Sequence, residues 1–82
     1  LAYMAKKDWS NARQYLDKAM EIARDLDSKY HMGQVMYDIG KMHLEKGETS
    51  EAGKNFKEAR KVFEEIGAQR LLGDVTADMD SL

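Results

Sequence analysis

Two histidines are the residues best suited to acid–base chemistry or metal binding in this 82-residue chain, and their spacing favours neither role. His31 and His43 lie 12 residues apart without an HExxH motif or a Cys-His pair near them. The chain has no cysteine, so it has neither disulfides nor thiolate metal ligands. We therefore expect His43 to be a packed histidine with one satisfied nitrogen. His31 should lie solvated near a helix start.

Hydroxyl and carboxylate side chains give no catalytic pattern either. No serine lies in a G-x-S-x-G setting, and most serines and threonines fall at predicted helix starts, where a capping role suffices. The paired acids Glu64-Glu65 and the set Asp74, Asp78 and Asp80 have the spacing of solvated helix faces. The glycines form no phosphate-binding loop. We predict no catalytic residue, no metal site and no cofactor, and hence a protein that is not an enzyme.

Composition points to a small helical domain. Proline is absent, and a charged fraction of 34% beside a hydrophobic fraction of 43% is typical of amphipathic helices. A net charge of −2 disfavours nucleic acid as a partner, and no apolar run is long enough for a membrane span. The lack of cysteine suits the cytosol, and we expect a cytoplasmic protein. Because the chain begins with Leu1, we also expect it to be a fragment of a longer protein.

Hydrophobic periodicity predicts an all-α fold with five helices joined by turns of two to four residues. The first, at the N-terminus, should be truncated; the second should run to about Asp25, with Asp8 or Ser10 as its cap. The remaining three are expected over about 29–46, from Thr49 or Ser50 to Gly67, and over about 68–79. Gly47 and Gly67 are suited to end the third and fourth helices because glycine accepts the left-handed conformation there.

Small and large residues alternate across two of these helices. Met36-x2-Ile39-Gly40-x2-His43 is followed by Ala52-x3-Phe56-x2-Ala59. Helices pack closely when small residues on one receive large residues from the other, so we expect these two to form an antiparallel pair. Sliding the sequence by 40 residues repeats the pattern: Ala12 falls on Ala52, Leu16 on Phe56, and Gly33 on Gly73.

This pattern resembles the tetratricopeptide repeat signature W-x2-L-G-x2-Y followed by A-x3-F. It departs from it at Met36, at His43 and in the absent proline. The resemblance implies an α-solenoid of antiparallel helix pairs, with 1–27 a partial repeat, 28–67 a full repeat and 68–82 a capping helix. The 40-residue period exceeds the usual 34 and resembles the long repeats of kinesin light chains and of bacterial and archaeal signalling regulators. HEAT and armadillo repeats also have periods near 40, so a HEAT-like fold is the alternative.

The resemblance implies a protein-interaction module that binds a peptide or helix through a concave face. In this family the first helix of each pair lines that face. Away from its core stripe, the helix over 29–46 carries Gln34, Tyr37, Asp38, Lys41 and Glu45, which successive turns place on one strip. We expect this strip to contact the partner. Asp38 argues against the acidic chaperone tails that some members bind.

The alternative function is a structural or self-association segment without a peptide ligand. We expect Leu1, Tyr3 and Met4 to belong to a first helix whose upstream half is missing. That would leave the apolar side of Trp9, Leu16 and Ile22 partly open. Since repeat units bury their apolar faces against neighbours, an uncovered edge favours association. We expect a homodimer through this N-terminal edge, with two-fold symmetry.

Overall fold

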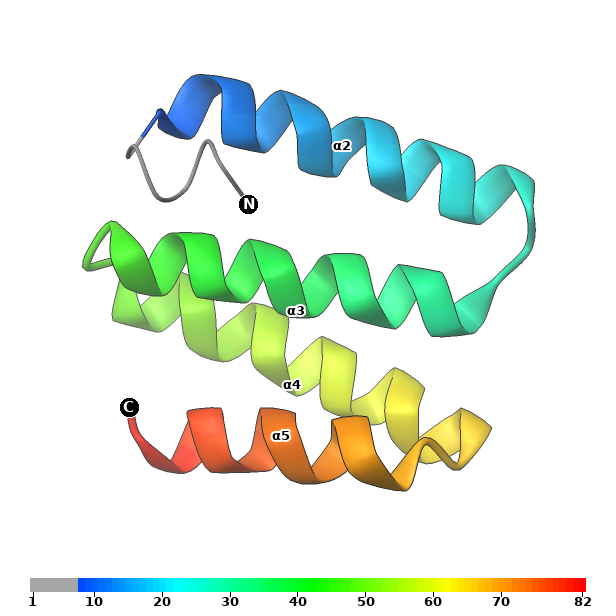
Figure 1. Ribbon diagram of the computed structural model, residues 1–82. Helices are drawn as coiled ribbons and strands as arrows, with labels where there is room; N and C mark the ends of the chain where they lie inside the picture. The colour runs from blue at the N-terminus through cyan, green and yellow to red at the C-terminus, as the bar shows by residue number, and fades with distance from the viewer. Residues whose placement is uncertain (1–7) are drawn as a thin grey trace.

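In the computed structural model, which describes residues 8–82, the chain forms α-helices that run back and forth in chain order (Figure 1). The helices are α2 (Trp9–Asp25), α3 (Lys29–Glu45), α4 (Thr49–Ile66) and α5 (Gln69–Asp80). They form an all-α helical-repeat fold, as the periodicity predicts. The predicted first helix lies outside the described residues, and so do Leu1, Tyr3 and Met4 of the expected dimer edge.

Local signals account for where most helices begin and end. Asp8 caps α2 by accepting the Asn11 backbone N–H at 3.3 Å, and Ser28 caps α3 by accepting that of His31 at 3.3 Å. Gly47 and Gly67 have positive φ angles of 79° and 71° after α3 and α4, which fits the left-handed conformation expected of them.

The predicted cap of α4 is wrong. The capping position falls on Glu48, whose side chain makes no cap hydrogen bond, and both Thr49 and Ser50 lie inside the helix. The Glu48 carboxylate instead accepts a hydrogen bond from His43 Nδ1 at 2.7 Å. His43 therefore binds the carboxylate that would otherwise cap the backbone N–H groups at the start of α4.

Two hydrophobic clusters hold the helices together. One lies between α2 and α3 and includes the buried Leu16 and Met42; the other lies between α4 and α5, around the buried Phe56, Phe63 and Val75. The part-buried side chain of Met36 packs against both clusters. The core is therefore continuous from α2 to α5 through α3.

Two glycines allow α3 and α4 to approach closely. A Cβ atom at Gly33 would lie 2.6 Å from Phe63 Cε1, and one at Gly40 would lie 2.6 Å from Phe56 Cδ1. Contacts that short force a neighbour to move, so only glycine fits without rearrangement. The small-to-large pairing predicted for these two helices is confirmed at Gly40, and Gly33 makes a second contact of the same kind.

The 40-residue offset is visible in the geometry as well as in the sequence. The starts of α2 and α4, at residues 9 and 49, differ by 40, as do those of α3 and α5, at 29 and 69. The connecting turns also match: Ser28 N–H donates to the Ala23 carbonyl at 3.0 Å, and Ala68 N–H donates to the Phe63 carbonyl at 2.9 Å. The α2–α3 pair and the α4–α5 pair are thus repeats of one local structure.

Candidate functional site

The predicted strip follows one side of α3, and its five residues differ in how far they reach solvent. Lys41 and Glu45 are exposed, whereas Gln34, Tyr37 and Asp38 are part-buried. The Gln34 amide donates to the Tyr30 hydroxyl at 3.3 Å, one turn earlier on the same helix. The strip is continuous along α3, but its middle is engaged with neighbouring side chains.

Tyr37 is not the exposed contact residue that the sequence suggested. Its ring packs edge-on against Phe56 at a centroid distance of 5.6 Å, and its hydroxyl donates to the Asp78 carboxylate of α5. Burial, followed by this hydrogen bond and the charge of Asp78, raises the pKa of the Tyr37 hydroxyl far above its usual range. Tyr37 therefore connects α3 to α4 and α5, and only part of its ring remains available to a partner.

Asp78 itself was expected on a fully solvated face, and that expectation is also wrong. It is part-buried because it accepts the Tyr37 hydroxyl, whereas Asp74 and Asp80 on the same helix are exposed. Its hydrogen-bond partner, Tyr37, lies 41 residues earlier in the chain, so the local sequence pattern of α5 does not predict the contact.

Lys41 and Asp38 form a small charged cluster over the Tyr37 ring. The Lys41 ammonium lies 4.5 Å from the ring centroid and 3.7 Å from Asp38 Oδ1. Partial burial raises the pKa of the Asp38 carboxyl, and the nearby Lys41 charge offsets part of that effect. The cluster is half-exposed, so a bound partner could still reach both charges.

Both histidines have side-chain partners close to them in the sequence. His43 is part-buried and bonded to Glu48, as a packed histidine should be, and His31 is exposed with Nδ1 2.6 Å from Ser28 Oγ at the start of α3. Across residues 8–82 no group of three or more histidines, cysteines or acids is close enough to hold a metal ion. Over the same residues, no helix combines the length and apolar character needed to cross a membrane.

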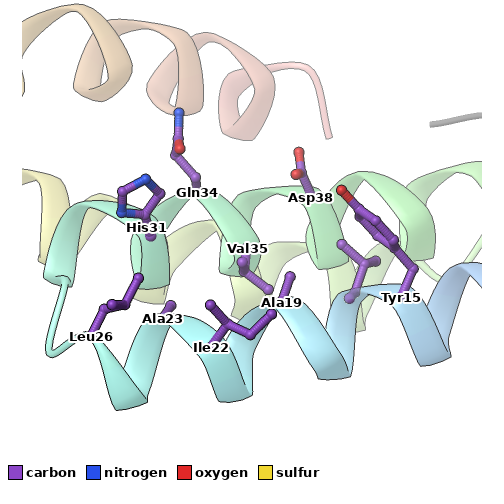
Figure 2. Close-up of a pocket in the computed structure, with 10 residues that line it drawn as sticks. Tyr15, Ala19, Ile22, Ala23, Leu26, His31, Gln34, Val35 and Asp38 are labelled. Atoms are coloured by element: carbon purple, nitrogen blue, oxygen red, sulfur yellow. The ribbon is translucent and has the colours of Figure 1, made fainter.

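The sequence reasoning missed a groove between α2 and α3, shown in Figure 2. Its volume is about 370 Å³, and its walls include Tyr15, Ile22 and Leu26 of α2 and Val35 and Asp38 of α3. The periodicity of α2 allows either Ile22 or Ala23 on its core stripe and includes Leu26. In the structure Ala23 takes the buried position, whereas Ile22 and Leu26 are 49% and 67% exposed. Their spacing of four residues on an amphipathic helix was the available signal.

Comparison with known protein families decides between the tetratricopeptide and HEAT-like repeats that a 40-residue period allows. The model of the tetratricopeptide repeat matches residues 1–65 of the 82. The chain belongs to the tetratricopeptide repeat family. Searches of curated proteins and of solved structures returned no match. As a tetratricopeptide repeat protein it is a protein-interaction repeat module, and the paired helices, close glycine contacts and recurring turns described above are those of stacked repeats.

Proposed function

We propose that this tetratricopeptide repeat protein binds a segment of a partner protein along the strip on α3, extended by the facing acids of α5. Family membership supports the class of function, and the strip supplies a continuous polar surface of helix length. The hydrogen bond from Tyr37 to Asp78 holds α5 beside α3, so the acids of α5 lie next to the strip. The binding surface is thus held by two helices.

The charge of this surface favours a partner that carries basic residues. Asp38, Glu45 and Asp74 contribute carboxylates, whereas Lys41 is the one cation of the strip and is already 3.7 Å from Asp38. An acidic segment would meet uncompensated carboxylates, and like charges across an interface are strongly unfavourable. The excess of carboxylates over cations is the observation that carries this proposal.

Charge-reversal variants test the proposal directly. We would measure fluorescence anisotropy of two labelled peptides of equal length, one alternating arginine with alanine and the other glutamate with alanine. The arginine peptide should bind the more tightly, and Glu45→Lys combined with Asp74→Lys should weaken it about 10-fold or more. Neither residue packs in the core, so the fold should survive.

Glu51→Lys combined with Glu58→Lys is the matched control, because both residues are exposed on α4 and the net charge changes by the same amount. Equal weakening by the two double variants would show only a general charge effect and would contradict a site on α3 and α5.

A further inference from the structure

The surface across α3 and α5 carries hydrogen-bond donors at one end and carboxylates at the other. The two helices run in the same direction and in register, because Tyr30 lines a pocket with Arg70 and Tyr37 bonds to Asp78 (Figure 1). Their corresponding ends therefore lie together. We propose that the partner segment is bipolar, with an acidic side chain over the N-terminal ends of α3 and α5 and basic side chains over the C-terminal halves. This inference rests on the function proposed above and adds the order of charges along the partner.

The N-terminal end of this surface, called here the donor end, is suited to a carboxylate. It holds a pocket of about 230 Å³ lined by Tyr30 and by the start of α5, including Arg70. The Tyr30 hydroxyl accepts the Gln34 amide at 3.3 Å, so its own hydrogen remains to be donated. Arg70 is exposed and has no ion pair among residues 8–82, and a guanidinium can bind a carboxylate through two parallel N–H donors. Glu65, at the end of α4, is paired with Lys29 Nζ at 3.4 Å and so does not compete for this site.

The other end of the surface, called here the acceptor end, has the opposite chemistry. The pKa of the Tyr37 hydroxyl is raised by burial and by three nearby carboxylates, those of Asp38, Asp74 and Asp78. Lys41 Nζ lies 3.7 Å from Asp38 Oδ1, so a side-chain cation is already accommodated there. One ammonium group does not balance three carboxylates. A basic residue of the partner would supply the charge that is lacking.

The separation of the two ends sets the spacing of charges in the partner. Tyr30 and Asp38 are eight residues apart in α3, which is about 12 Å along the helix axis. Arg70 and Asp78 repeat this separation in α5. An extended chain covers that distance in about four residues. We therefore expect an extended segment whose acidic residue lies about four positions from its basic residues.

Peptides of one composition and different charge order test the inference. Three labelled ten-residue peptides would each contain two glutamates and four arginines, with the glutamates first, last or interleaved with the arginines. In fluorescence anisotropy with the 82-residue protein, the better of the two segregated peptides should bind about 5-fold more tightly than the interleaved one, since it alone pairs with both ends. Equal binding by all three would overturn the bipolar arrangement and leave the proposed function standing. If the arginine–alanine peptide described above also failed to bind, both would be overturned.

Arg70→Glu separates the donor end from a general charge effect, because the two predict changes of opposite sign. The substitution makes the protein more negative, so a general effect would tighten the binding of any net-positive peptide. We instead expect the segregated peptide to bind about 5-fold more weakly and the arginine–alanine peptide not to weaken. Lys57→Glu, at an exposed residue of α4, changes the net charge equally and should weaken neither. Tighter binding of the segregated peptide by both variants would overturn the inference without touching the proposed function.

Paramagnetic labels on the segregated peptide locate its two ends on the protein. A label beside the glutamates should broaden the amide NMR signals of Tyr30 and Arg70. A label beside the arginines should broaden those of Lys41 and Asp78 instead. The reverse pattern, or equal broadening at both ends by either label, would overturn the assigned order of charges.

Discussion

The Tyr37 hydroxyl of α3 and the Asp78 carboxylate of α5 form a hydrogen bond between helices that occupy corresponding places in the 40-residue repeat. The Tyr37 ring also packs edge-on against Phe56 of α4, so one side chain of α3 contacts both following helices. Because the surface proposed to bind a partner spans α3 and α5, this bond joins its two parts.

Removing the Tyr37 hydroxyl should lower the free energy of unfolding. We expect Tyr37→Phe to cost about 1–2 kcal/mol, because it deletes a hydrogen bond to a charged group at a part-buried site and leaves Asp78 without its donor. Urea unfolding followed by circular dichroism measures the change. Tyr15→Phe is the control, since Tyr15 is 50% exposed; a loss equal to that of Tyr37→Phe would contradict the importance of the Asp78 bond.

The same bond predicts a dependence on alkaline pH. The pKa of Tyr37 is raised in the folded protein above its ordinary value of 10.0, so its contribution to stability is complete below pH 10 and is lost as the pH rises beyond it. The stability difference between the wild-type protein and Tyr37→Phe should therefore shrink above pH 10. A difference that stays constant to pH 12 would refute the raised pKa.

Two glycines 40 residues apart should respond to alanine in opposite directions. Gly33→Ala should destabilise by about 1–3 kcal/mol through the contact with Phe63. At Gly73 an added Cβ meets nothing within 4 Å, so Gly73→Ala should stabilise by about 0.5–1 kcal/mol through helix propensity alone. Thermal or urea unfolding compares the pair. Stabilisation by both substitutions would mean that the side chains of Phe63 and Val62 move aside easily at Gly33.

Leucine substitutions should destabilise the protein at the buried α3–α4 contact but not on the exposed side of α4. Gly40→Leu and Ala59→Leu should each destabilise by about 1–3 kcal/mol, because both positions are fully enclosed. Lys57→Leu on the exposed side of α4 should change stability little. Similar urea midpoints for all three variants would show that the pairing of these helices has been misread.

The His43–Glu48 bond predicts a loss of stability in acid. Hydrogen bonding from His43 lowers the pKa of Glu48 below its ordinary value of 4.5, so the contribution of the pair is present above that value and disappears as the pH falls through the lowered pKa. Glu48→Gln should unfold with a weaker pH dependence between pH 5 and 3. Thermal unfolding at several pH values measures it, and identical profiles for the two proteins would rule the contribution out.

Metal ions and nucleotides should leave the melting temperature unchanged. The described residues contain no ligand cluster for a cation, and the sequence contains no phosphate-binding loop. Differential scanning fluorimetry with zinc, magnesium and ATP provides the check. A reproducible increase with any of the three would require a binding site that the arrangement of residues 8–82 does not suggest.

The sequence predicted the helices because their determinants are local. Asp8, Ser28, Gly47 and Gly67 act within one turn of themselves, and the apolar stripes need only a 3.6-residue period. Tyr37 could not be placed in the same way. It lies between the core stripe and the solvent face, and its exposure depends on α5, which reaches it only after the chain has passed through α4.

The groove was missed for a related reason. The periodicity of α2 identifies an apolar side without saying which part of it another helix covers. Ile22 and Ala23 are adjacent in sequence and equally compatible with the stripe, yet one is 49% exposed and the other 1%. Only the crossing of α2 and α3 distinguishes them, and a single helix does not contain that information.

The order in which the helices contact one another has a consequence for amide hydrogen exchange. Among the described helices, α3 packs against α2 on one side and α4 on the other, whereas α2 has its main contact with α3 alone. Local opening of α2 therefore breaks one interface, but opening of α3 must break two. Amides of α3 and α4 should exchange most slowly, and those of α2 should exchange earlier.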